Sequence, residues 1–294
     1  MRIFVTGANG WIGSAVIPEL LAAGHSVLGL ARSDSSAATV QGLGADVVRG
    51  ELADLDVLRS AAEESDGVVH LGYVHDFTRM DDAARTDLAA IETFGAALAG
   101  TDKPLLIASG TLGLKPGDVG TEDDFPVDGV HPRTGNGKVV LDMADQGVRS
   151  MVVRFAPTVH GPKDHGFVAT LVAIARDKGV AGYVGDGANR WPAIHRLDAA
   201  KLVQLAIDKA PARSVLHAIA EEGIKTRDIA EAIGRGLDLP VVSVAAEQAV
   251  EHFSWMGGFI GADAPASNHK TRSLLDWTPT HPTLIDDLDA GAYF

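Results

Sequence analysis

The chain of 294 residues contains no cysteine. A disulfide framework and a thiolate metal site are therefore excluded, and a reducing, cytoplasmic setting is expected. No apolar run approaches the roughly 20 residues that a membrane-spanning helix needs. Because an apolar strand-like segment follows Met1 almost at once, we expect no signal or transit peptide. Tyrosine is also scarce, with three residues in the chain, and this shortage bears on the chemistry below.

Positive charge is in short supply as well. The chain has 25 Lys and Arg against 39 Asp and Glu, which gives a formal net charge of −14. Nucleic acids and anionic membranes bind clusters of Lys and Arg, so neither is an expected partner. No His-Glu-x-x-His pattern and no carboxylate cluster is present, so no metal is expected. The expected partner is a small-molecule substrate, and the sequence is compatible with a homodimer.

Apolar, strand-like segments alternate with helical patterns through the first half of the chain. The expected strands are residues 2–6, 26–30, 46–49, 67–71, 104–108 and 150–155. Helices are expected to start near Ile12, Ser35, Asp54, Asp82 and Gly137, and two of these residues, Ser35 and Asp54, are candidate N-caps. Strands that are apolar on both faces are typical of a parallel sheet covered by helices. The sequence therefore predicts an α/β, doubly wound, Rossmann-like fold with its ligand at the carboxyl ends of the strands.

The alternation loosens after Phe155, where proline and glycine mark irregular connections. We expect a dinucleotide-binding domain over residues 1–160 and a smaller α/β substrate-binding lobe over residues 161–294. Segments of the second half are compatible with additional strands at the edge of the first domain's sheet. Within the second half, an amphipathic helix with a Thr cap is expected over 226–236, followed by a strand over 240–244.

The segment between the first strand and the first helix carries the most informative motif. It reads Thr6-Gly-Ala-Asn-Gly-Trp-Ile-Gly13, with glycines at intervals of three. The free N–H groups and the positive dipole end of the following helix face this turn, and glycine lets a pyrophosphate approach the backbone. Its place between a strand and a helix predicts a dinucleotide site. The expected contacts in the turn are Gly7, Asn9, Gly10, Trp11, Ile12 and Gly13.

This motif resembles the TGxxGxxG signature of the short-chain dehydrogenase/reductase superfamily, in its extended or atypical branch with the NAD-dependent epimerases and dehydratases. The resemblance covers nearly the full length and is most specific before residue 165. It implies three further groups of cofactor contacts. The first group, Glu51 and Leu52, would contact the adenine, with Glu in place of the usual Asp. The second group, Leu71 and Gly72, follows the fourth strand. The third group belongs to the segment 154–162, which closes over the nicotinamide, and consists of Pro157, Thr158, Val159 and His160.

The end of the second strand selects between the two nicotinamide cofactors. A carboxylate there binds both ribose hydroxyls of NAD and repels a 2′-phosphate. This chain has Arg32, whose planar charged fork suits a phosphate, followed by Ser33 as a hydroxyl donor. A purely solvated Arg32 is the alternative, and Asp34 would favour NAD if it reached the ribose. We predict NADP(H), with NAD(H) as the less favoured cofactor.

The expected catalytic helix departs from the family pattern. The family uses a Tyr four residues before a Lys, so that the phenol exchanges a proton with the substrate while the Lys holds the nicotinamide ribose. Here Lys138 stands at the place of the Lys, but Thr134 stands at the place of the Tyr. A threonine hydroxyl can orient a carbonyl but is a poor general acid. Lys138 as an ordinary surface residue is the alternative.

In the family, a hydroxyl after the fifth strand holds the substrate oxygen, and Ser109 and Thr111 both fit this place. The alternative for either residue is a hydrogen bond to the backbone of a tight turn. Other proton donors stay open, since imidazole titrates near neutrality and a phenol elsewhere could substitute. They are Tyr73, Tyr183, His75, His131, His160 and His165, or water.

Three functions follow from these residues. The first is an NADP(H)-dependent oxidoreductase of the short-chain type that acts on a small carbonyl or alcohol. The second is a non-catalytic NADP(H)-binding sensor, which the missing Tyr favours. The third is a nucleotide-sugar epimerase or dehydratase, but the sequence shows no basic region that would bind a second pyrophosphate. Lys138, Ser109 and Thr111, together with the second lobe, favour the oxidoreductase.

Overall fold

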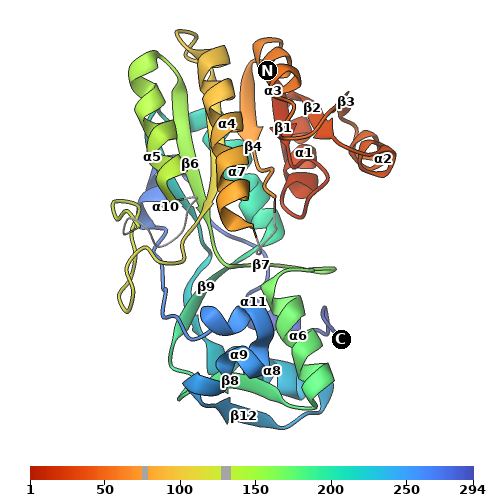
Figure 1. Ribbon diagram of the computed structural model, residues 1–294, viewed down its shortest axis with the longest axis vertical. Coiled ribbons are helices and arrows are strands. Elements are labelled where there is room, and N and C mark those ends of the chain that lie inside the picture. Colours follow the sequence, from red (N-terminus) through yellow and green to blue (C-terminus); the bar gives the residue numbers. More distant parts are fainter. Residues whose placement is uncertain (75–78, 127–133) are drawn as a thin grey trace.

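A seven-stranded sheet forms the larger of two lobes (Figure 1). The computed structural model describes residues 1–74, 79–126 and 134–294. Every strand pair in this sheet is parallel, and the order is β10-β6-β5-β4-β1-β2-β3. The strands are β1 (Arg2–Thr6), β2 (Ser26–Ala31), β3 (Asp46–Arg49), β4 (Gly67–His70), β5 (Pro104–Gly110), β6 (Arg149–Phe155) and β10 (Ser214–Ala218). The chain winds outward from β1 in both directions, so the order reverses between β1 and β4, where such sheets bind their ligand.

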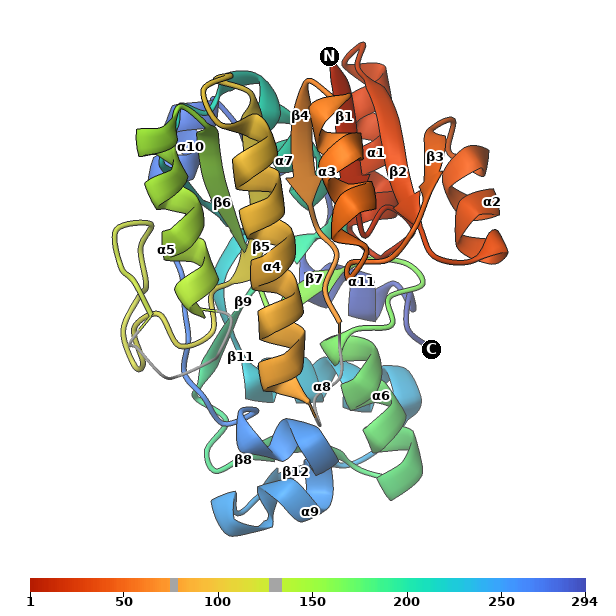
Figure 2. The same cartoon turned by 45° about the horizontal axis from the view of Figure 1, so that its top comes forward.

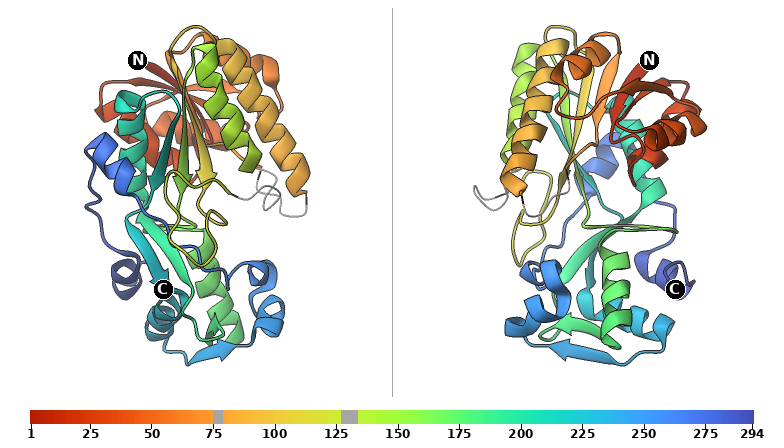
Figure 3. Two further views of the ribbon diagram at one scale, coloured as in Figure 1. Left: turned by 90° about the vertical axis from the view of Figure 1, so that its left-hand side faces the viewer. Right: turned by 45° about the vertical axis from the view of Figure 1, so that its right-hand side comes forward.

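Helices cover both faces of this sheet, because successive side chains of a strand point to opposite faces. Ile3 and Val5 of β1 join one buried cluster, whereas Phe4 joins the other. The first cluster packs beneath α1 (Gly13–Ala22), α2 (Asp34–Gly42) and α7 (Arg196–Lys209), with α10 (His269–Leu275) at its edge. The second packs beneath α3 (Leu55–Glu63), α4 (Met80–Leu98) and α5 (Thr134–Asp142), with η1 (Met143–Gln146) after it. The predicted doubly wound, Rossmann-like fold is confirmed (Figure 3).

The smaller lobe lies at the carboxyl ends of the large sheet, as Figures 1 and 2 show. It contains a two-stranded sheet and the outer part of the three-stranded sheet β11-β9-β7. Its strands are β7 (Thr158–His160), β8 (Ala181–Val184), β9 (Arg190–His195), β11 (Glu221–Lys225) and β12 (Val241–Val244). Its helices are α6 (Phe167–Lys178), α8 (Thr226–Leu237), η2 (Ala246–Gln248), α9 (Ala249–Phe253), η3 (Ser254–Gly258) and α11 (Leu284–Asp289). Residues 196–218 return to the large sheet as α7 and β10, so both lobes draw on the second half of the chain.

Four helix starts differ from the expected ones, and one of them is α4, which begins at Met80 rather than at Asp82. Ser33, not Ser35, caps α2, because its hydroxyl and that of Ser36 bond each other's backbone N–H in a capping box. Helix α5 begins at Thr134 rather than at Gly137. Thr226 is the first residue of α8 and not its cap, since its hydroxyl donates to the side chain of Asn189.

Candidate functional site

The glycine turn leaves three backbone donors free at the start of α1. Gly10 N–H donates to Gly7 O at 2.9 Å, and Ser14 N–H donates to Gly10 O at 3.0 Å, which closes the turn. Between them, the N–H groups of Trp11, Ile12 and Gly13 have no acceptor within the described residues. Free N–H groups at a helix N-terminus bind phosphate oxygens. The turn is therefore built to hold an anion.

Each glycine of the turn is needed for a different reason. Gly7 has φ +65°, and a Cβ there would lie 2.7 Å from the backbone of Leu71 and Gly72. A Cβ on Gly13 would lie 2.1 Å from Gly7 O, so the helix can pack this close to the strand only without a side chain. A Cβ on Gly10 would meet only the turn itself, at 3.0 Å from Gly7 O. Gly10 thus keeps open the space in front of the turn.

The end of β2 presents positive charge. Arg32 is exposed, and no ion pair involves it within the described residues. The carboxylate of Asp34, which could have favoured NAD, pairs with Arg49 at 2.9 Å. Arg49 also donates to the backbone oxygen of Ser33 and so lies beside the same corner. Arg49 gives no local signal in the sequence, because it ends another strand and only sheet pairing brings it here.

The adenine-side residues lie around the opposite wall of the turn. Glu51 is exposed, and its N–H donates to the carboxylate of Asp54, which precedes α3 as expected but does not cap it. The Leu52 side chain lies 3.1 Å from where a Cβ of Gly72 would be. Leu71 N–H donates to Thr6 O at 3.3 Å. The structure thus brings Leu52, Leu71 and Gly72 together beside Gly7.

Trp11 connects the turn to the second half of the chain. Its indole N–H donates to Val159 O at 2.8 Å, and the ring of His165 meets its ring edge-on at 5.4 Å. The guanidinium of Arg196 lies 4.3 Å from the Trp11 ring centroid and donates to Ser14 Oγ at 3.0 Å. Within the described residues Arg196 has no carboxylate partner, its buried Nε has no acceptor, and burial lowers its pKa. A half-buried arginine without a counter-charge beside this turn adds to its attraction for an anion.

The other residues of the nicotinamide-side segment have structural partners. Thr158 Oγ1 donates to Pro192 O, and His160 Nδ1 lies 2.6 Å from a carboxylate oxygen of Asp287. Burial lowers the pKa of His160 despite this carboxylate. Pro157 and Val159 are half-buried. Through Val159 and Trp11 the segment lies against the glycine turn, whereas the imidazole of His160 is buried away from solvent.

A fully buried polar network connects the glycine turn to α5. Gly72 N–H donates to Thr6 Oγ1 at 3.0 Å, and Thr6 Oγ1 lies 2.6 Å from His70 Nδ1. His70 Nε2 lies 3.3 Å from one oxygen of Asp87, and the Asn136 amide donates to the other at 2.7 Å. Because the Asp87 carboxylate can only accept, the imidazole proton is assigned to Nε2, and His70 Nδ1 then accepts the proton of the Thr6 hydroxyl. Sequence analysis missed Asp87 and Asn136 entirely.

The two hydroxyl candidates after β5 have different surroundings. Thr111 is buried, and its hydroxyl and N–H both donate to Phe155 O, at 3.4 and 3.1 Å. Ser109 is half-buried at the carboxyl end of β5, and no partner bonds its hydroxyl within the described residues. Ser109 is therefore the hydroxyl that is available to a substrate.

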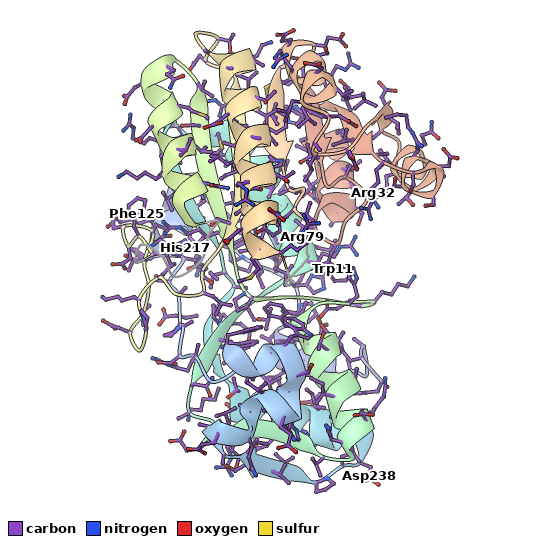
Figure 4. All side chains as sticks on the ribbon, viewed as in Figure 1. Trp11, Arg32, Arg79, Phe125, His217 and Asp238 are labelled. Atoms are coloured by element: carbon purple, nitrogen blue, oxygen red, sulfur yellow. The ribbon has the colours of Figure 1, made fainter. Side chains whose placement is uncertain are left out.

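The expected catalytic helix presents its lysine to a groove. Lys138 is exposed and lines a groove of about 1260 Å³ between α5 and α10 together with Phe125, Lys270 and Leu274. No residue of the glycine turn lines this groove, and Figure 4 places Trp11 and Phe125 apart. Thr134 opens α5, but its side chain lies outside the described part. The family roles of Lys138 and Thr134 stay predictions.

The alternative proton donors are scattered. Tyr73 directly follows Gly72 and is half-buried near the turn. Tyr183 lies on β8 beneath the guanidinium of Arg227, in the outer part of the small lobe. His75 and His131 lie outside the described residues. Within those residues, no group of His, Asp and Glu is arranged to hold a metal, and no helix is long and apolar enough to cross a membrane.

Arg154 and His217 form a second buried pair, at the ends of β6 and β10. Arg154 donates to His217 Nε2 at 3.3 Å and to Asp124 O at 2.7 Å, while His217 Nδ1 donates to Ser267 O at 2.7 Å. Burial, with Arg154 as a further cause, lowers the pKa of His217 to about 4. Burial also lowers the pKa of Arg154 to about 10. His217 is therefore neutral in the folded protein near pH 7.

Stability is expected to fall between about pH 6.5 and 4 because of His217. Unfolded chains take up its proton near 6.5, whereas the folded protein does so only near 4. Acid therefore favours unfolding, with a loss on the order of 3 kcal/mol across this window. Urea unfolding at pH 7, 5.5 and 4.5 should show a shallower decline for His217→Gln than for wild type. Equal declines would show that His217 is not the group that titrates.

Comparisons with known proteins agree with this geometry. A model of the NAD dependent epimerase/dehydratase family matches residues 3–217. An uncharacterized protein of Schizosaccharomyces pombe is 46% identical over 295 residues and 100% of each chain. A 2-alkyl-3-oxoalkanoate reductase of Stenotrophomonas maltophilia is 30% identical over 65% of this chain and 60% of its own. The structure of a dTDP-glucose 4,6-dehydratase double mutant from Streptomyces venezuelae with NAD bound has the same fold, with a TM-score of 0.79 at 20% identity over 99% of this chain and 96% of that one.

Proposed function

The chain belongs to the NAD-dependent epimerase/dehydratase family, and from this premise we propose that it is an NADP(H)-dependent oxidoreductase acting on a small carbonyl or alcohol. One observation carries the proposal: within the described residues the N–H groups of Trp11, Ile12 and Gly13 have no acceptor, and Gly10 leaves the space in front of the turn clear. A dinucleotide pyrophosphate fits both the donors and the space. Arg196, which lies against Trp11 without a counter-charge in the described residues, supports the same anion.

The preference for NADP(H) is supported by the charges at the end of β2. Arg32 is exposed there, and Asp34 pairs with Arg49 instead of pointing a free carboxylate at the ribose. Arg32 can therefore bind a 2′-phosphate, with the Ser33 hydroxyl beside it. A strand end with a free carboxylate would repel that phosphate.

The chain's own residues would hold and protonate the substrate. When bound, the reduced nicotinamide supplies a hydride to the carbonyl carbon, and the carbonyl oxygen gains a proton. Ser109 Oγ holds that oxygen, because Thr111 is already engaged with Phe155 O. Tyr73 gives the proton in this proposal, since it follows Gly72 beside the turn. Tyr293 is unsuited, because burial and the adjacent Asp164 raise its pKa.

The Ser109 hydroxyl, which has no partner among the described residues, and the presence of a second lobe favour an enzyme over a protein that only senses NADP(H). A nucleotide-sugar epimerase or dehydratase is less favoured. Such a substrate brings a second pyrophosphate, but Arg190 of β9 already makes a two-pronged bond to Asp263, at 3.0 and 2.8 Å. An arginine held in this way is not available to a phosphate.

Arg32→Ala is expected to weaken NADPH binding about ten- to a hundredfold, because a charge-assisted contact to the 2′-phosphate is lost. NADH, which lacks that phosphate, should bind wild type and variant alike. Calorimetric titration of both cofactors gives the two ratios. Arg59→Ala is the matched control, since Arg59 is an exposed arginine paired with Asp56 on α3. Equal losses for NADPH and NADH would assign Arg32 a role other than 2′-phosphate recognition.

A further inference from the structure

Four aromatic side chains gather on the small lobe and form what we call the aromatic cluster: Phe167, Trp191, Trp255 and Phe259. The Phe167 ring lies 5.9, 5.7 and 5.3 Å from the rings of Trp191, Trp255 and Phe259. Trp191 and Phe259 are stacked at 5.9 Å with an interplanar angle of 14°. Trp191 is fully buried and anchors the cluster, whereas Trp255 is 42% exposed. The cluster thus has a buried base and an exposed aromatic edge.

The cluster approaches the glycine turn through Phe167. Phe167 opens α6 two residues after His165, whose ring meets the ring of Trp11 at 5.4 Å. Figure 2 shows the start of α6 and helix α9 on the side of the small lobe that faces the first turn of α4. Trp255 is the second residue of η3, which follows α9 directly. The aromatic cluster therefore belongs to the surface of the small lobe that faces the carboxyl ends of the large sheet.

The backbone at the cluster is strained in a way that sets the place of Trp255. Ser254 has φ +54° and ψ −133°, a region that residues other than glycine rarely adopt. Such a conformation persists where the surrounding structure imposes it, and it is common at binding sites. Here it turns the chain between α9 and η3, immediately before the exposed indole.

Charge is neutralised beside the cluster. Arg190 precedes Trp191 on β9, but Asp263 holds its guanidinium through two hydrogen bonds. The Asn189 amide donates to Ile260 O at 2.9 Å and so fixes the loop after Phe259. Among the described residues, the side chains of Arg190 and Asn189 are therefore already engaged and are not available to a charged ligand.

We propose that the aromatic cluster is the substrate subsite and that the substrate is an uncharged carbonyl compound carrying an aromatic ring. The inference rests on the proposed function and names its substrate class. A flat ring would stack against Trp255 and Phe259, and its carbonyl would extend toward the turn. In the reduction, the carbonyl carbon receives the hydride and its oxygen a proton, so the ketone becomes an alcohol as NADPH becomes NADP⁺.

Steady-state kinetics with 1-phenyl-1,2-propanedione and 2,3-pentanedione test the proposal, since only the first carries a ring. Trp255→Ala should raise KM for the phenyl compound about tenfold or more, because both stacking and buried area are lost. It should change KM for 2,3-pentanedione less than twofold and leave the NADPH dissociation constant unchanged. Trp255→Phe, which keeps a ring, should retain most of the preference, whereas Trp255→Leu, which keeps only apolar bulk, should not.

Leu274→Ala is the matched control, because Leu274 is 45% exposed but lies on α10. Equal KM changes for both diketones, or retained preference in Trp255→Leu, would overturn recognition of a ring. If UDP competed with 2,3-pentanedione at a lower concentration than the phenyl compound does, the proposal would be overturned in favour of a nucleotide-bearing substrate. A failure of the proposed function is recognised separately, because the wild-type protein would then bind no NADPH.

Discussion

Gly10→Val is expected to abolish NADP(H) binding while the protein stays folded. A Cβ at residue 10 meets only the oxygen of Gly7, at 3.0 Å, so the valine methyl groups would extend into the space in front of the free N–H groups of Trp11, Ile12 and Gly13. That space is the one that a pyrophosphate needs. Calorimetry should show at least a hundredfold loss of NADPH affinity, about 2.7 kcal/mol or more, which follows from RT ln of the ratio. Thermal unfolding should shift by only a few degrees.

Gly13→Ala separates this effect from a packing defect. Its Cβ would lie 2.1 Å from Gly7 O, so this variant should lose stability and affinity together. Wild-type NADPH affinity in Gly10→Val would show that the turn does not bind the pyrophosphate, and the assignment of the cofactor site would be wrong.

Asp87→Ala is expected to destabilise the protein by about 2–5 kcal/mol, because two buried donors lose their acceptor and each such loss costs about 1–3 kcal/mol. Asp87 is 1% exposed and accepts from both His70 and Asn136, which are themselves buried. Without its carboxylate, the Nε2 proton of His70 and the amide of Asn136 lose these acceptors. Chemical unfolding monitored by circular dichroism measures the loss.

Asp82→Ala is the control on the same helix. The Asp82 side chain is 42% exposed and pairs with Arg79 and Arg85, so its removal should leave the unfolding midpoint nearly unchanged. A similar small change for Asp87→Ala would mean that the network from Thr6 to Asn136 does not stabilise the large lobe.

Much of the fold was predictable because its signals are local. The alternation of Ile3, Phe4 and Val5 between two faces, and the glycine spacing from Gly7 to Gly13, are visible in a few consecutive residues. The family resemblance and the parallel sheet that they predicted are confirmed. The N-cap of α2 is two residues from the expected one because Ser33, Ser35 and Ser36 compete for the cap, and only the backbone geometry selects Ser33.

The parts of the site that were missed depend on contacts between distant segments. Arg49 meets Asp34 across strands, Asn136 meets Asp87 between α4 and α5, and Arg196 meets Ser14 between α7 and α1. No spacing along the chain announces such pairs, since sheet order and helix packing create them. The absent Tyr at position 134 removed the strongest catalytic signal, so the proton donor had to be sought among side chains with no motif of their own.

The central claim is hydride transfer, and one measurement tests it most directly. The wild-type protein is incubated with NADPH deuterated at C4 and with both diketones, and the alcohol products are analysed by mass spectrometry. The account predicts deuterium on the carbinol carbon, delivered from one face of the nicotinamide. If the labelled NADPH binds but transfers deuterium to neither carbonyl compound, the claim is contradicted. That result would favour a protein that only senses the cofactor.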